Sequence, residues 1–108
     1  MALTKDFKAT VVARVQSDPA FARALLDEAL TSVLNGDPET AKLLLRDLIN
    51  ATIGFEALAE DLRKPSKSLH RMLSRTGNPT LENFSAVLVS VRKALRVDVR
   101  AVVSPATA

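Results

Sequence analysis

The residues best suited to chemistry are gathered in one stretch of the 108-residue chain, positions 63–75. The whole chain has 15 Lys and Arg against 12 Asp and Glu, and without this stretch the balance would be 10 against 12. The basic excess is therefore local. A local basic patch on a helix attracts a phosphate backbone, although an ordinary solvated face is the alternative. The stretch contains no acidic residue, and its basic residues are Arg63, Lys64, Lys67, Arg71 and Arg75.

Most of the polar and basic side chains of this stretch are expected on the outward face of a short helix that begins near Ser66. Leu69 and Leu73 have helical spacing and turn to the inner face. Arg71 can donate two hydrogen bonds to guanine or clamp a phosphate, and Lys67, nearer the helix start, can reach a base edge or a close phosphate. Serine and histidine side chains can donate to phosphate as well. The candidate DNA-binding residues are Ser66, Lys67, Ser68, His70, Arg71, Ser74 and Arg75.

An enzyme active site is not expected from the residue types present. The chain has one His, no Cys and no Tyr, and we find no glycine-rich loop that would hold a phosphate. At helical spacing His70 has Lys67 and Ser74 as neighbours, and neither supplies the carboxylate that would orient a catalytic base. A lone His also lacks the second His or the Cys that a metal site needs. We therefore expect no catalytic residue, no metal and no cofactor.

Two short helices with a tight break between them must position the candidate residues. Residues 55–62 carry apolar side chains at helical spacing. Pro65, with Arg63 and Lys64 before it, interrupts this pattern, because proline lacks a backbone N–H and disfavours helical angles in the preceding residue. A helix, a short bend and a second helix with a basic free face form the sequence pattern of a helix-turn-helix. This pattern predicts binding to double-stranded DNA.

The same residues resemble a known family. The segments IGFEALA (53–59), PSKSLHRML (65–73) and GNPT (77–80) are similar to the addiction-module antidote proteins, the HigA-like antitoxins with a repressor-type (XRE/Cro-like) helix-turn-helix. The resemblance covers roughly residues 3–96. It implies a type II antitoxin that neutralises a RelE-like toxin and, as a homodimer, represses its own operon at an operator in its promoter. The alternative is a stand-alone prophage or housekeeping repressor with no toxin partner.

The turn departs from the repressor pattern, which usually has glycine followed by an aliphatic residue. Here these positions hold Arg63 and Lys64. A positive φ angle is costly for a residue with a Cβ atom. We therefore expect a wider turn in this chain.

The rest of the chain predicts an all-α fold, a five- to six-helix bundle with a short C-terminal strand. The resemblance implies that this bundle is of the lambda-repressor-like class. Asp18 and Asp37 each precede a proline and read as helix N-caps. Asn35-Gly36 predicts the C-terminal end of a helix. Pro79 and Thr80 start the last helix, and the remaining helices are expected over residues 3–16, 19–34 and 38–52.

Three regions follow from these elements. Residues 1–36 form an N-terminal helical extension, which is our hypothesis for the toxin contact, and residues 37–96 form the helix-turn-helix domain. Residues 97–108 form a tail in which valine alternates with charged residues, a pattern typical of a strand. One strand alone is not stable, so this segment either pairs with the same strand of a second copy or ends the chain loosely.

Composition adds the expected location. The chain is 47% hydrophobic and lacks cysteine, which fits a reducing cytosol. No apolar run approaches the roughly 20 residues that span a membrane, and the N-terminus MALTKDFKAT does not resemble a signal peptide. We expect a cytoplasmic protein that makes no membrane contact and is associated with the nucleoid when it is bound to DNA.

Overall fold

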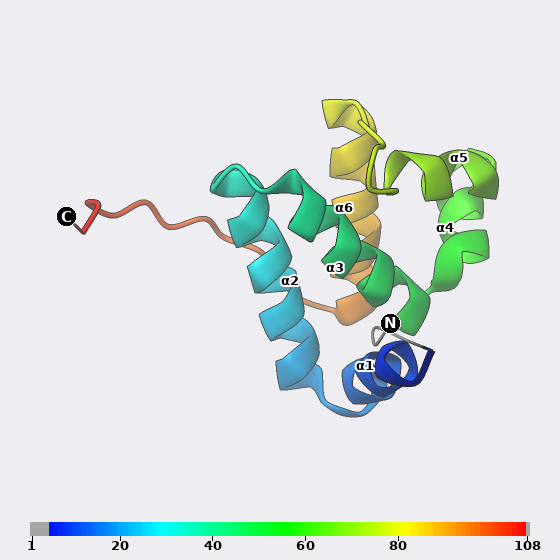
Figure 1. Cartoon of the computed structure of the whole chain (residues 1–108), viewed down its shortest axis with the longest axis horizontal. Helices are drawn as coiled ribbons and strands as arrows, with labels where there is room; N and C mark the ends of the chain where they lie inside the picture. Colours follow the sequence, from blue (N-terminus) through cyan, green and yellow to red (C-terminus); the bar gives the residue numbers. More distant parts are fainter. Residues whose placement is uncertain (1–4, 108) are drawn as a thin grey trace.

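Six helices make up the part of the chain that the computed structural model describes, residues 5–107 (Figure 1). The predicted all-α class with five or six helices is confirmed. None of the described helices is long and apolar enough to cross a lipid bilayer. The helices are α1 (Lys5–Ser17), α2 (Pro19–Leu34), α3 (Pro38–Ala51), α4 (Gly54–Leu62), α5 (Ser66–Met72) and α6 (Leu81–Leu95).

Side chains cap the starts of three helices, two of them as the sequence predicted. The Asp18 carboxylate accepts a hydrogen bond from the backbone N–H of Phe21 at 3.2 Å, and the Asp37 carboxylate accepts one from Thr40 at the same distance. The hydroxyl of Thr80 caps α6 by accepting from Asn83 at 3.1 Å. Each bond satisfies one backbone donor that a helix N-terminus leaves without a partner.

Three helices end in the same hydrogen-bond pattern, the Schellman motif, with one residue at positive φ. At the end of α2 this residue is Gly36, with φ 84°, as expected for a helix stop. At the ends of α4 and α6 it is Arg63, with φ 55°, and Arg96, with φ 58°. In each motif the following N–H reaches back five residues, for example from Val97 to the Arg92 carbonyl at 3.2 Å.

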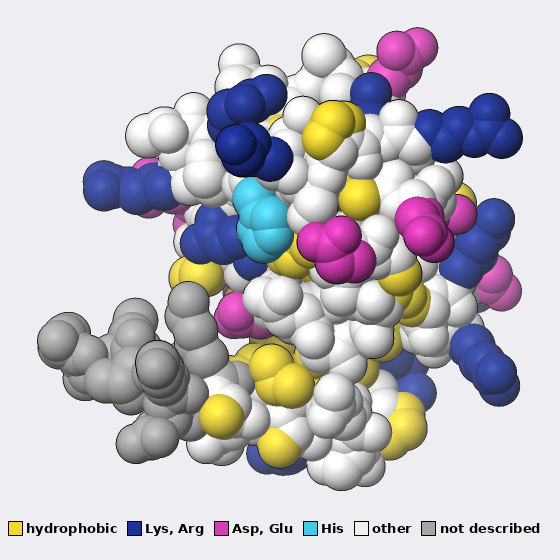
Figure 2. Space-filling model, turned by 90° about the vertical axis from the view of Figure 1, so that its right-hand side faces the viewer, with side chains coloured by type: hydrophobic (Ala, Val, Ile, Leu, Met, Phe, Trp, Pro, Cys, Tyr) yellow, Lys and Arg dark blue, Asp and Glu magenta, His cyan; other side chains and the backbone are white. Residues whose placement is uncertain are grey.

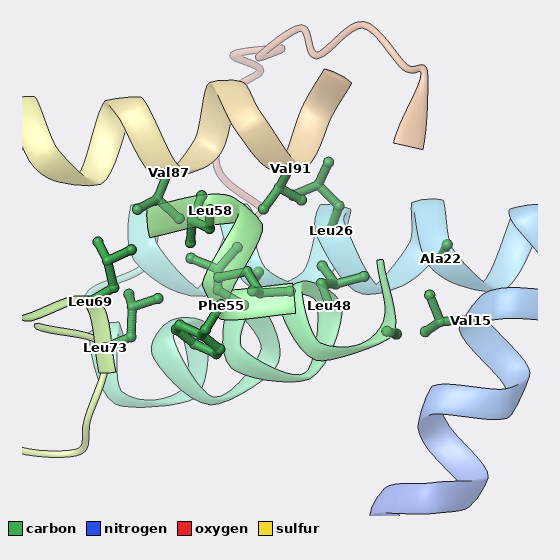
Figure 3. Packing of buried hydrophobic residues seen from close by; sticks show 14 of the residues in the cluster. Val15, Ala22, Leu26, Leu48, Phe55, Leu58, Leu69, Leu73, Val87 and Val91 are labelled. Atoms are coloured by element: carbon green, nitrogen blue, oxygen red, sulfur yellow. The ribbon is translucent and has the colours of Figure 1, made fainter. Parts of the chain in front are cut away.

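One hydrophobic core joins the N-terminal helices to the later ones. The central helix α3 packs against α1, α2 and α4, and α6 packs against α4 and α2. The Ser90 hydroxyl in α6 also donates a hydrogen bond to the Asp61 carboxylate in α4. Figure 3 shows α1 and α2 side chains at one end of the same layer that holds α4 and α6 side chains. The large side chains with no exposed surface are Leu45, Leu48, Ile49, Leu58, Leu69, Leu73, Val87 and Val91.

The predicted C-terminal strand is wrong for the isolated chain. Residues 97–107 have no regular secondary structure and extend away from the helices (Figure 1). Val97 packs against the core, and the residues from Asp98 to Thr107 are exposed. A strand requires backbone partners on a neighbouring strand, and the described part of one chain offers none to this segment.

Candidate nucleic-acid interface

Two buried leucines fix the orientation of α5. Leu69, in the middle of the helix, and Leu73, at its C-terminal cap, have no exposed surface. Figure 3 shows both side chains turned toward the layer that contains Phe55 and Leu58 of α4 and Val87 of α6. With this side buried, helical geometry turns the intervening polar side chains away from the core.

The opposite side of α5 carries the predicted residues. Lys67, His70 and Arg71 are exposed, and the flanking serines are partly exposed. We call these three residues and the serines 66 and 68 the α5 face. In Figure 2 the single histidine lies among Lys and Arg side chains, with acidic side chains below and to one side of it. The α5 face therefore has a positive surface with neighbouring carboxylates outside it.

A ring contact that the sequence analysis missed positions His70. Its imidazole stacks on the ring of Phe55 in α4, with ring centroids 3.9 Å apart and an angle of 21° between the planes. Phe55 is itself buried. The histidine ring is thereby held flat against α4, while the side chain remains exposed. Phe55 was predicted as a core residue, but nothing in the local sequence indicates this pairing across the turn.

The turn between α4 and α5 is tight, and the expected wider turn is wrong. Arg63 adopts the left-handed conformation at φ 55° and ψ 46°. Its N–H donates to the Glu60 carbonyl at 3.3 Å, and the N–H of Lys64 donates to the Ala59 carbonyl at 3.0 Å. These two bonds satisfy the end of α4 and offset the cost of a left-handed arginine. Pro65 follows and leads directly into α5.

Two cations of α3 hold the C-terminal side of α5. The buried Lys42 donates from Nζ to the carbonyl of Arg75 at 3.0 Å and to that of Gly77 at 2.6 Å. Arg46 donates to the carbonyl of Leu73. These carbonyls follow the end of a helix, where positive charge is favourable. Neither cation was predicted from the sequence, where each is only a basic residue beside the apolar stripe of α3.

Gly77 lets the loop after α5 fold back on the helix. A Cβ atom at this position would lie 2.1 Å from the Arg71 carbonyl oxygen and 2.5 Å from that of Met72. Both are backbone atoms, so the space cannot be opened by rotating a side chain. Only glycine fits here without movement of the backbone.

The side chains of two further predicted residues make polar contacts within the chain. Arg75 forms an ion pair with Glu39 of α3, with 3.0 Å between Nε and Oε2, and both side chains are largely exposed. The Ser74 hydroxyl donates to the Arg71 carbonyl at 2.7 Å. Ser74 and Arg75 thus lie at the edge of the α5 face, and exposed pairs of this kind are weak enough to exchange partners.

A polar groove of about 560 Å³ runs between α5 and the start of α6. Its walls join residues from the turn, from α5 and from the loop that Gly77 closes. The groove thus places further hydrogen-bond donors and an additional cation, Lys64, beside the α5 face. The polar and charged residues in its walls include Lys64, Ser68, Arg71, Asn78, Thr80 and Asn83.

Within residues 5–107, no group of three or more His, Cys, Asp or Glu side chains is placed to hold a metal ion. In comparisons with known proteins, no family model, no curated protein and no solved structure matched this chain.

Proposed function

We propose that this chain is a DNA-binding transcriptional repressor in which α4 and α5 form a helix-turn-helix and α5 enters the major groove. The observation that carries the proposal is the α5 face, with Lys67, His70 and Arg71 exposed. The helix is anchored from behind by Leu69 and Leu73. A short basic helix fixed on a rigid core fits the geometry by which such motifs read DNA.

The residues of the α5 face suggest separate tasks. Lys67 and Arg71 are four residues apart and both exposed. Arg71 would donate two hydrogen bonds to a guanine or clamp a phosphate, and Lys67 would bind a base edge or phosphate near the helix start. The hydroxyls of Ser66 and Ser68 would donate to phosphates, which set register rather than sequence. His70, held by its stack on Phe55, would donate a hydrogen bond either to a base edge or to a phosphate.

A dimer fits this function best. With seven residues, α5 offers few base contacts, so specific binding calls for two copies on a palindromic operator. The two half-sites would lie about one helical turn apart, roughly 34–36 Å between centres. We place this operator in the promoter of the chain's own gene.

The resemblance to the addiction-module antidote proteins supports a second role, neutralisation of a RelE-like toxin. We propose that α1 and α2 contact the toxin, since the proposed helix-turn-helix of α4 and α5 requires neither of these helices at the DNA surface. The competing function is repression without a toxin partner. A small basic reading frame that overlaps or adjoins the gene would favour the antitoxin, and its absence would favour the stand-alone repressor.

Fluorescence anisotropy with the chain's own upstream DNA tests the proposal over a salt series. An unrelated duplex and the double variant Lys67→Ala/Arg71→Ala run in parallel. We expect tight binding to the upstream DNA alone, and a loss of at least about tenfold in the variant, with a shallower salt dependence.

The matched control is Arg14→Ala/Lys93→Ala, which removes two exposed cations from α1 and α6 and leaves the α5 face intact. It should bind nearly as the parent does. Equal weak binding to both duplexes, or equal losses in both double variants with the fold intact by circular dichroism, would contradict a specific repressor.

A further inference from the structure

The C-terminal segment carries three exposed valines. Val99, Val102 and Val103 are 46%, 86% and 96% exposed. All three follow Val97, the last residue that packs against the core, and the segment extends away from the helices (Figure 1). Scattered exposed valines are ordinary, but neighbouring ones on an extended backbone mark a surface that binds another chain.

The segment has the pattern of a strand with two different faces. In an extended chain alternate side chains point to opposite sides, so Val97, Val99, Ala101 and Val103 share one side. Asp98, Arg100 and Val102 lie on the other side. Valine favours strands because its branched side chain packs well on a pleated surface. The missing element is a partner backbone, and an identical segment would supply it.

The charges select one register for such a pair. If two copies run antiparallel with Val99 opposite Val99, then Asp98 faces Arg100 of the other strand, and twofold symmetry repeats this pair. A slip of two residues puts Arg100 opposite Arg100 in one direction and Asp98 opposite Asp98 in the other. A slip of one residue puts Val99 opposite Arg100 and mixes the two faces.

We propose that residues 97–101 of two copies pair as an antiparallel two-stranded ribbon centred on Val99, with Asp98 and Arg100 forming reciprocal ion pairs. This inference deepens the dimeric repressor proposed above and names the segment that joins its two copies. Within one chain Asp98 forms an ion pair with Arg92 at 3.6 Å, which is longer than a hydrogen bond, and the Asp98 side chain is fully exposed at 102%. The carboxylate is therefore accessible to a second chain.

A ribbon of two strands is only marginally stable in water, so its apolar side needs a surface to cover. A surface that could be covered in this way lies beside the start of the ribbon at Val97. A groove of about 390 Å³ is lined mainly by apolar residues, among them Ala22, Ile53 and Leu95, with Gln16, Arg23 and Thr52 also in its wall. Leu95 precedes Val97 by two residues, so the ribbon would form next to this groove in both copies.

Sedimentation velocity of the full chain without DNA tests the register. The parent should be a dimer, and Asp98→Arg and Arg100→Asp should each weaken association about tenfold, since each places like charges opposite in both pairs. The double exchange Asp98→Arg/Arg100→Asp should restore it. An equimolar mixture of the two single variants should also associate, because one strand then carries only positive and the other only negative charge at these positions.

A cysteine pair gives an independent measure of the same register. The chain has no native cysteine. On mild oxidation Val99→Cys should form a disulfide-linked dimer, because opposite residues in an antiparallel pair lie within disulfide range. Val102→Cys is more exposed but would stand about 20 Å from its counterpart in this register, and should stay largely unlinked.

A monomeric parent at all concentrations would overturn the inference, as would a double exchange that fails to restore association or equal cross-linking at positions 99 and 102. None of these measurements contains DNA, so their failure is distinct from a failure of the repressor proposal. That proposal depends on the anisotropy experiment with Lys67 and Arg71.

Discussion

The Nζ atom of Lys42 lies 2.6 Å from the carbonyl oxygen of Gly77, so a buried cation of α3 holds the loop behind α5. The two residues are 35 positions apart in sequence. This contact makes the orientation of the α5 face depend on α3 as well as on the leucines beneath it.

Replacing Lys42 with methionine should therefore destabilise the protein by about 1–3 kcal/mol, because it leaves the carbonyls of Arg75 and Gly77 without this donor in a partly buried site. Urea unfolding followed by circular dichroism measures the change. Lys93→Met, at an exposed position of α6, serves as the control and should change stability by less than about 0.5 kcal/mol. Equal effects of the two changes would argue against a structural role for Lys42.

Gly77→Ala should destabilise the fold by about 1–3 kcal/mol, since the added Cβ would meet the Arg71 carbonyl at 2.1 Å and the backbone would have to move. The neighbouring Thr76→Ala, in an exposed part of the same loop, should be nearly neutral. Thermal unfolding of both variants distinguishes them. A stable Gly77→Ala protein would mean that the loop has an alternative path over α5.

Arg63→Gly should stabilise the protein by roughly 0.5–1 kcal/mol, because glycine adopts the left-handed angles of the α4–α5 turn without the cost that arginine carries. The gain is reduced by the greater freedom of glycine in the unfolded chain. Lys64→Gly, next to it at an ordinary φ, should give no gain. Chemical denaturation of the two variants tests the difference, and a loss of stability in Arg63→Gly would show that its side chain makes a compensating contribution.

Stability should fall in acid because of the two aspartate caps. A hydrogen bond from the Arg14 side chain, followed by one from the Phe21 amide, lowers the pKa of Asp18 below its ordinary 3.8. Hydrogen bonds from the Thr40 hydroxyl and amide lower the pKa of Asp37 in the same way. A carboxyl group whose pKa is lower in the folded state contributes its full stabilisation when the pH is above its pKa in the unfolded state. This contribution is lost as the pH falls through its pKa in the folded state.

Asparagine caps helices about as well as aspartate but does not titrate. The variant Asp18→Asn/Asp37→Asn should therefore lose less stability than the parent between pH 6 and pH 3 in urea unfolding. Glu28→Gln, on the exposed side of α2, should keep the pH dependence of the parent. The idea fails if the double variant and the parent show the same acid loss.

Local signals in the sequence predicted the helices well. Asp18 and Asp37 cap their helices because each needs only a backbone N–H three residues later. The inward direction of Leu69 and the outward direction of Lys67 follow from helical periodicity alone. Such features depend on neighbours within one or two turns.

Features were missed where they depend on contacts between distant residues or on a balance between opposing energies. The contact of Lys42 with Gly77 and the stack of His70 on Phe55 join separate elements, so neither leaves a local pattern. The turn was mispredicted because the cost of a left-handed Arg63 was counted without the two capping hydrogen bonds that offset it. The tail at residues 97–108 was predicted either to pair with a second copy or to end the chain loosely. Over its described residues a single chain shows the loose end, because a strand requires a partner that one chain does not contain.

The shortness of α5 has a consequence for how the protein would respond to heat. Seven residues are far fewer than the about 12–15 that an isolated helix needs in water, so the helix exists only while the core beneath Leu69 and Leu73 is intact. Lys67 and Arg71 therefore keep their spacing up to the melting temperature and lose it together. If the chain is the repressor proposed above, its occupancy of the operator should then follow the folded fraction of the whole molecule and end abruptly on warming.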